Sequence, residues 1–148
     1  MKVVAISGGF DPIHIGHIRL LKAAKALGDK LIVILNNDNW LAVKKGFAFM
    51  PEQERKEVLL AMQYVDEVVI TSHPNNPTDM SVCKELEQLK PDIFANGGDR
   101  KPDADPVPEV ELCNRLGIEL VYNVGGEKAQ SSSQLVHKAL GLKSKSLK

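Results

Sequence analysis

Two histidines near the N-terminus have the residue type and spacing to act on phosphate groups. His14 and His17 are three residues apart, so a helix would place both rings on one side. They follow a turn that contains Gly8 and Gly9, and Gly16 lies between them. Glycine lets the backbone approach an anion with no Cβ in the way, and the start of a helix offers unpaired N–H groups. The segment therefore predicts a phosphate-binding turn that carries two imidazoles.

Residues 8–17 read GGFDPIHIGH, which resembles the signature of the nucleotidyltransferase superfamily that includes the cytidylyltransferases. In that family the two histidines stabilise the transition state while the α-phosphate of a nucleoside triphosphate is attacked. By resemblance, these catalytic roles fall on His14 and His17. We expect Asp11 to cap the helix or order the turn rather than act as a base. The resemblance assigns the remaining motif residues to nucleotide binding, namely Gly8, Gly9, Phe10, Asp11 and Gly16.

Cationic residues after the second expected strand are candidate phosphate clamps. The cytidylyltransferases carry a lysine in the loop after that strand and a Glu-x-Arg-type segment in the next helix, which Lys44 or Lys45 and Arg55 match. A lysine would neutralise a triphosphate or an acceptor phosphate, and an arginine can bind phosphate through two nitrogens. The sequence does not decide between the two lysines. We assign Lys44 and Arg55 to catalysis, and Asp38 and Lys45 to the acceptor substrate.

Two later segments resemble nucleotide contacts of the same superfamily. The Gly-Gly-Asp sequence at 97–99 is similar to that of heptose-1-phosphate adenylyltransferases, although a plain turn explains the glycines equally well. The three serines at 131–133 are similar to the motif that opens the last helix of the family, where hydroxyls and N–H groups bind phosphate. Plain N-capping by one serine is compatible with that role. The implied nucleotide-binding residues are Gly98, Asp99, Ser131, Ser132 and Ser133.

Two positions depart from the family pattern. Gly126 stands where the family often has an arginine about five residues before the serine motif, with Lys128 as a substitute cation nearby. Gln63 stands where a second arginine occurs late in the preceding helix. Fewer fixed cations suggest a different acceptor or weaker catalysis. Trp40 either stacks on a base or anchors its own loop.

Apolar runs of strand length alternate with helical patterns along the chain. Strands are expected at 2–7, 31–35, 66–70, 91–95 and 118–122, and helices at 15–27, 51–64, 79–89, 108–116 and 131–140. Residues 36–50 are interpreted as a polar loop. The alternation predicts one Rossmann-like α/β domain over 1–140, with a five-stranded parallel sheet, helices on both faces and a basic tail at 141–148. Ligands bind at the carboxyl ends of such strands, where the candidate segments fall.

Composition argues against several classes of protein. The 19 basic and 19 acidic residues give a formal net charge of +0, which disfavours a nucleic-acid partner. No signal peptide and no apolar run long enough to span a bilayer are apparent, so we expect a cytoplasmic protein with no membrane partner. Cys83 and Cys113 are interpreted as buried hydrophobes rather than a disulfide or ligand pair. His73 and His137 are expected at the surface, and no cluster suggests a metal site.

These features predict an enzyme that transfers CMP or AMP from CTP or ATP to a small phosphorylated alcohol or sugar phosphate and releases pyrophosphate. The resemblance favours the glycerol-3-phosphate cytidylyltransferase type from segment 44–69, with heptose-1-phosphate-type adenylyl transfer as the alternative from 96–102. A nucleotide-binding sensor with a degenerate site is an alternative of another class. The resemblance also implies Mg²⁺ carried by the triphosphate and a homodimer. His-Ile-Gly-His also spells the class I aminoacyl-tRNA synthetase motif, but 148 residues leave no room for tRNA-recognition domains.

Overall fold

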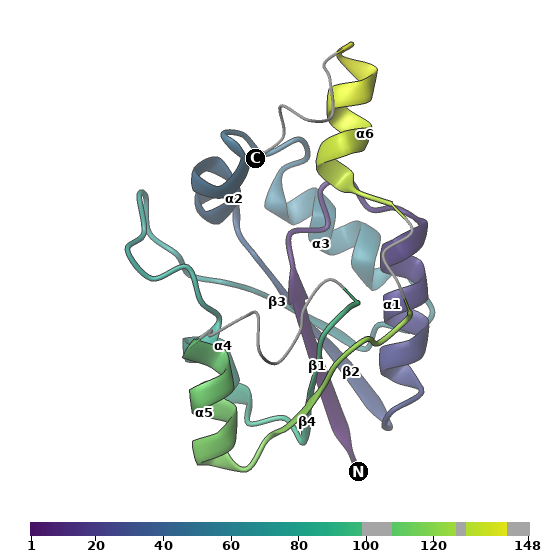
Figure 1. The fold of residues 1–148 in the computed structure, drawn as a ribbon, viewed down its shortest axis with the longest axis vertical. Helices are drawn as coiled ribbons and strands as arrows, with labels where there is room; N and C mark the ends of the chain where they lie inside the picture. The colour runs from purple at the N-terminus through teal and green to yellow at the C-terminus, as the bar shows by residue number, and fades with distance from the viewer. Residues whose placement is uncertain (99–107, 127–129, 142–148) are drawn as a thin grey trace.

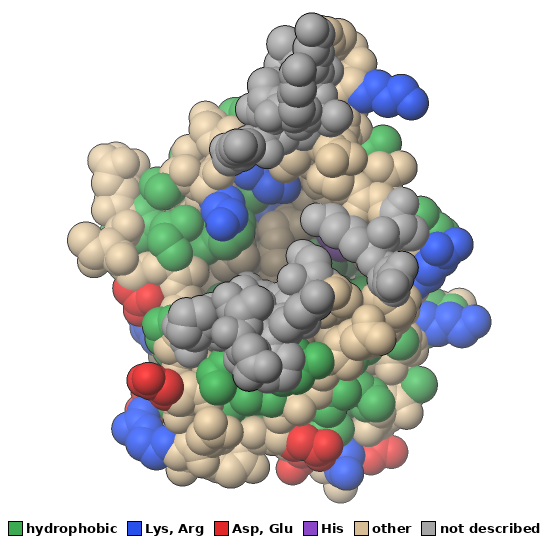
Figure 2. Space-filling view, viewed as in Figure 1, with side chains coloured by type: hydrophobic (Ala, Val, Ile, Leu, Met, Phe, Trp, Pro, Cys, Tyr) green, Lys and Arg blue, Asp and Glu red, His purple; other side chains and the backbone are tan. Residues whose placement is uncertain are grey.

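A five-stranded parallel sheet forms the centre of the structure, a computed structural model that describes residues 1–98, 108–126 and 130–141. The strands pair in the order β3-β2-β1-β4-β5 (Figure 1), and each pairing is parallel. Their bounds are Val3–Gly8 for β1, Lys30–Leu35 for β2, Glu67–Ile70 for β3, Ile93–Ala95 for β4 and Glu119–Val121 for β5. The predicted α/β class and parallel sheet are confirmed. A hollow is visible near the middle of the molecule in Figure 2.

Six helices accompany the sheet within the described residues. They are α1 Ile15–Lys25, α2 Asp38–Lys45, α3 Glu52–Leu60, α4 Cys83–Leu89, α5 Pro108–Leu116 and α6 Ser132–Ala139. Helices α1 and α3 lie on one side of the sheet, and α4 and α5 lie on the other (Figure 1). The predicted covering of both faces is therefore confirmed.

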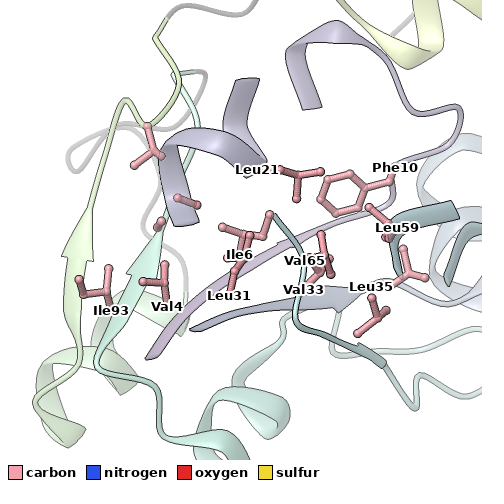
Figure 3. Close-up of a cluster of buried hydrophobic side chains, with 14 residues drawn as sticks. Val4, Ile6, Phe10, Leu21, Leu31, Val33, Leu35, Leu59, Val65 and Ile93 are labelled. Atoms are coloured by element: carbon pink, nitrogen blue, oxygen red, sulfur yellow. The ribbon is translucent and has the colours of Figure 1, made fainter. Parts of the chain in front are cut away.

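Side chains that alternate along the strands pack into two separate cores, as expected when both faces of a sheet are covered. One cluster joins strand residues to α1 and α3 (Figure 3), and its members include Val4, Ile6, Leu31, Val33, Leu21 and Leu59. The other joins the opposite face to α4 and α5, and its members include Ala5, Ile34, Phe94, Leu86 and Leu112. The sheet is thus held rigidly between two apolar layers, which fixes the positions of the loops at its carboxyl end.

Helix α2 corrects the expectation that residues 36–50 form a loop. Asn37 caps its start, with the Oδ1 atom accepting the backbone N–H of Trp40 at 3.0 Å. Gly46 ends it in the left-handed region at φ +88°, where a glycine carries no steric penalty. Half of the eight residues of α2 are polar and the helix is short, so hydrophobic periodicity did not reveal it; its two caps, nine positions apart, are the signal in the sequence.

His73 is buried, so the expectation of a surface position is wrong. Its Nδ1 atom lies 2.8 Å from Thr71 Oγ1, and its Nε2 atom lies 3.0 Å from the carbonyl oxygen of Ser81. His137 is half-buried. The ring of His73 thereby ties the end of β3 to the segment before α4.

The two cysteines lie in the α4–α5 layer and are free thiols. Cys113 is fully buried, and burial raises the pKa of its thiol to about 11. It is therefore neutral near pH 7 and packs as a small hydrophobe. Among the described residues, no helix is both long enough and apolar enough to cross a membrane.

Candidate active site

A cavity of about 390 Å³ opens at the carboxyl ends of the strands. Six segments of the described chain line it: the end of β1 with the turn after it, the start of α1, helix α2, the end of β4 with the residues after it, the turn after β5, and the start of α6. Figure 2 shows the hollow with a histidine at its edge. Chain segments that are far apart in the sequence therefore meet at one site, as the parallel topology predicts.

His14 and His17 both line the cavity and together form the N-terminal cap of α1. The Nδ1 atom of His14 accepts the backbone N–H of Gly16 at 3.0 Å. The Nδ1 atom of His17 accepts the backbone N–H of His14 at 3.2 Å. Their rings are stacked, with centroids 3.8 Å apart and an interplanar angle of 20°.

This capping arrangement determines where each ring carries its proton. A nitrogen that accepts a backbone N–H is unprotonated, so the neutral ring carries its proton at Nε2. The two Nε2–H groups are hydrogen-bond donors, the type of group that stabilises charge on phosphate oxygens.

Gly16 is required by the geometry of the same cap. A Cβ atom at this position would lie 2.9 Å from Cε1 of the His14 ring, so any side chain would displace that ring. The glycine between the two histidines therefore leaves room for the imidazole, in addition to opening the helix start.

Two buried side chains, those of Phe10 and Asp11, stabilise the turn before the histidines. Phe10 is buried with φ +49°, and its ring centroid lies 4.7 Å from that of His17. Asp11 is buried, and its carboxylate accepts the backbone N–H groups of Phe49 and Met50. Asp11 thus orders the turn, as expected, but it does not cap α1. Gly9 and Phe10 line the cavity, whereas Gly8 and Asp11 are not among the described residues that do.

Arg55 has a different position from the expected phosphate clamp. Its side chain is buried, and every guanidinium nitrogen donates to a protein acceptor. Nε donates to Met50 O at 2.8 Å, Nη1 to Gly9 O and Asn36 O at 2.9 and 2.7 Å, and Nη2 to Asp38 Oδ1 at 2.7 Å. Neither Arg55 nor Asp38 is among the described lining residues. We therefore correct both assignments: the pair fixes the glycine turn to α2 and α3.

Three cationic residues of the described chain line the cavity. Lys44 and Lys45 on α2 were expected, and the structure places both at the cavity wall. The helical pattern of residues 15–27 alone places Arg19 on the outward side of the helix, away from Leu20 and Leu21, yet Arg19 also lines the cavity. Its position two residues after His17, near the start of the helix, was the available signal. In the described part of the chain, Arg19 makes no hydrogen bond or ion pair.

Gly125 and Gly126 form the opposite edge of the cavity, close to Arg19. Both have positive φ, +83° and +81°. A Cβ atom on Gly125 would lie 3.0 Å from Leu20 Cα and 3.2 Å from Arg19 C, so the turn packs on the helix that carries the arginine. Position 126, where the family often has an arginine, thus directly follows a glycine that packs on the backbone of α1 at Arg19 and Leu20. Lys128 lies outside the described residues.

The three serines meet the cavity at the start of α6. Ser131 caps this helix, with its Oγ accepting the N–H of Gln134 at 3.3 Å. Ser132 Oγ donates to the carbonyl oxygen of Pro12 at 2.7 Å, which ties α6 to the histidine turn. The N–H groups at the start of α6 also lie at the cavity, a favourable place for an anion.

The Gly-Gly-Asp segment reaches the cavity through its glycines. Gly97 and Gly98 line it, directly after β4. Asp99 lies outside the described residues. Within the described ranges, no three His, Cys, Asp or Glu side chains form a group that could hold a metal ion.

The fold and this cavity define a nucleotidyltransferase. Residues 5–133 match the cytidylyltransferase-like family, and the chain belongs to that family. It is 40% identical over 119 residues to the FAD synthase of Pyrococcus abyssi, covering 80% of this chain and 77% of that enzyme. It is 33% identical over 150 residues to the FAD synthase of Ferroglobus placidus, covering 100% of this chain and 94% of that enzyme. The chain is an enzyme that transfers a nucleotidyl group and releases pyrophosphate.

One further relative and one solved structure are also similar to this chain. The bifunctional protein HldE of Citrifermentans bemidjiense is 34% identical over 141 residues, covering 94% of this chain but 27% of that longer protein. The solved structure of a lipopolysaccharide core biosynthesis protein from Thermoplasma volcanium is 30% identical, with a TM-score of 0.65 and coverage of 82% of this chain and 95% of that one.

Proposed function

We propose that this enzyme transfers AMP from ATP to the phosphate of FMN, forming FAD and releasing pyrophosphate. The observation that carries the proposal is the match to archaeal FAD synthases, one of which aligns with the whole of this chain. FAD is FMN joined through its phosphate to AMP, so a nucleotidyltransferase that makes FAD must act on ATP and FMN. The expected preference for glycerol-3-phosphate and CTP gains no support from these relatives, and adenylyl transfer takes its place.

In the proposed reaction, a phosphate oxygen of FMN attacks the α-phosphorus of ATP. The bond from the α-phosphorus to its bridging oxygen breaks, and pyrophosphate leaves with that oxygen. No nucleophilic side chain is required, because the acceptor phosphate is already ionised. His14 and His17 donate from Nε2 to phosphate oxygens, and these hydrogen bonds strengthen as charge develops in the transition state.

The cations and helix termini around the cavity hold the remaining charge. Arg19 and the start of α6 lie toward β4 and β5, where we place the triphosphate. Lys44 and Lys45 lie on α2, which follows β2 on the other side of β1 from β4. We place the acceptor phosphate there. Mg²⁺ would accompany the triphosphate and be held mainly by its oxygens and by water.

A second candidate is adenylyl transfer to a sugar phosphate. The similarity to HldE and to the Thermoplasma volcanium lipopolysaccharide core biosynthesis protein favours it. Both candidates share the donor nucleotide and the histidine chemistry and differ only in the acceptor.

An acceptor panel tests the proposal. Pyrophosphate release and product formation are measured with ATP and with CTP against FMN, glycerol 3-phosphate and heptose 1-phosphate. We expect ATP with FMN to give the highest kcat/KM, with FAD and pyrophosphate formed in equal amounts. Faster turnover of heptose 1-phosphate would support the second candidate, and nucleotide binding without turnover of any acceptor would contradict both.

A further inference from the structure

The cavity has two chemically different walls. The wall toward β4 and β5 includes glycine backbone, serines, Arg19 and the start of α6, which suit the phosphates of a nucleotide. The chain order reverses between β1 and β4 in the sheet, and that switch point is where nucleotides bind in this class of fold. The opposite wall is helix α2, which contributes Trp40, Lys44 and Lys45.

The indole of Trp40 is anchored by a hydrogen bond. The Nε1 atom donates to the carbonyl oxygen of Met80 at 2.9 Å. The opposite edge of the ring faces Gly9, with Cζ3 3.9 Å from where a Cβ on that glycine would stand. The ring is half-buried and lines the cavity, so part of it remains accessible.

The start of α2 is held firmly in place, which fixes the backbone of Trp40. Asn37 caps the helix and donates from Nδ2 to the carbonyl oxygen of His73 at 2.9 Å, and its own N–H donates to Thr71 Oγ1 at 3.0 Å. Asn39 Nδ2 donates to the same His73 oxygen at 2.9 Å. The buried ring of His73 in turn bridges Thr71 and Ser81. The wall is therefore prearranged before any ligand binds.

Lys44 follows Trp40 by one helical turn, so the two side chains share one face of α2. An aromatic surface next to a cation matches a ligand that has a planar ring at one end and a phosphate at the other. A sugar phosphate offers a phosphate but no planar ring to stack on an indole.

We propose that Trp40 is the residue that makes this enzyme select an acceptor with a planar aromatic ring, by stacking on the isoalloxazine of FMN while Lys44 meets its phosphate. This inference rests on the proposed function and adds the residue that distinguishes FMN from a sugar phosphate. Trp40 touches the ring system and not the reacting phosphorus, so it affects acceptor affinity more than the chemical step.

The test compares FMN with ribitol 5-phosphate, which is FMN without its ring. In the native protein we expect FMN to have the lower KM. Trp40→Leu should raise the KM for FMN by about tenfold or more, the typical contribution of stacking on an aromatic side chain, with a smaller change in kcat. The KM for ATP and for ribitol 5-phosphate should change by less than about threefold. Trp40→Phe, which keeps a ring, should recover most of the affinity for FMN.

Two controls accompany these variants. Val43→Ala alters an exposed residue of the same helix outside the described cavity wall, and should leave the FMN titration unchanged. Binding of FMN without ATP is followed by its visible absorption, which stacking on an indole perturbs; the perturbation should disappear in Trp40→Leu. An equal loss of affinity for ATP and FMN in Trp40→Leu, or an unchanged KM for FMN, would overturn the inference.

The same data separate the two proposals. If the native protein adenylylates FMN but Trp40→Leu keeps its preference for FMN over ribitol 5-phosphate, the stacking inference fails and the proposed function stands. If the native protein does not adenylylate FMN at all, the proposed function fails, and the inference fails with it.

Discussion

The imidazole of His14 stacks on that of His17 with ring centroids 3.8 Å apart, while each Nδ1 atom accepts a backbone N–H at the start of α1. The same two rings therefore cap the helix and line the cavity, and each neutral ring carries its proton at Nε2. The proposed reaction would add a chemical role to this cap, and mutations can separate the two roles.

His14→Asn should separate capping from chemistry. Asparagine is a favourable N-cap residue, so this variant should unfold close to the native free energy, whereas His14→Ala should lose about 1 kcal/mol. Both variants should lose about 100-fold or more in kcat, because both lack the Nε2–H donor. Urea unfolding and steady-state kinetics check the two expectations. Full activity in His14→Asn would show that the ring is only a cap.

Arg55→Ala should act on stability rather than on nucleotide affinity. Its removal leaves the buried carbonyl oxygens of Gly9 and Asn36 without their donor, and we expect a loss of about 3 kcal/mol or more in the free energy of unfolding. Arg55→Lys should recover little, because one ammonium cannot replace the planar guanidinium. A variant that unfolds like the native protein but binds ATP poorly would restore the phosphate-clamp interpretation.

Arg19→Ala should weaken binding of ATP. Because the variant loses a charge-assisted hydrogen bond to phosphate, we expect its KM for ATP to rise by about tenfold or more. The KM of the variant should also depend less on salt concentration than that of the native protein. Lys22→Ala is the matched control, because Lys22 is an exposed cation on the same helix outside the described wall of the cavity. Equal effects of the two variants would mean that Arg19 acts only through general surface charge.

The carboxylate of Asp66 should make the free energy of unfolding depend on pH in the acidic range. Its hydrogen bond with Lys25, and a second one from the N–H of Leu31, lower the pKa of this carboxyl in the folded state. The stabilisation is therefore present above the usual carboxyl pKa and is lost as pH falls through the lowered value. Asp66→Asn should cost at most about 1 kcal/mol at pH 7, because the pair is partly exposed, and less at pH 2 to 3. Thermal unfolding at both pH values measures the difference, and an equal cost at both would contradict the linkage.

The strands and their parallel order were predictable because buried strands are continuous apolar runs. Residues 31–35, for example, have no polar side chain, and the structure places β2 there with one extra residue at its start. Helix α2 was missed because it is only eight residues long and half of these residues are polar, although its caps, Asn37 and Gly46, mark both ends.

The candidate site was only partly predictable for a similar reason. The pattern of His14, Gly16 and His17 predicts a turn with two imidazoles, and the structure places both rings at the cavity, but which ring nitrogen faces the backbone depends on side-chain torsions that no spacing reveals. Arg55 has the residue type of a phosphate clamp, and its burial follows from loops that fold back over it. Arg19 shows the reverse: the helical pattern predicts a solvated residue, but the turn at Gly125 packs on this part of α1 and Arg19 lines the cavity beside it.

The most direct test of the paired-imidazole account is FAD synthesis by the double variant His14→Gln/His17→Gln at saturating ATP and FMN. With the native fold confirmed by circular dichroism, we expect turnover to fall by about 1,000-fold or more while the dissociation constant for ATP changes by less than about tenfold. Turnover equal to that of the native enzyme would contradict the account.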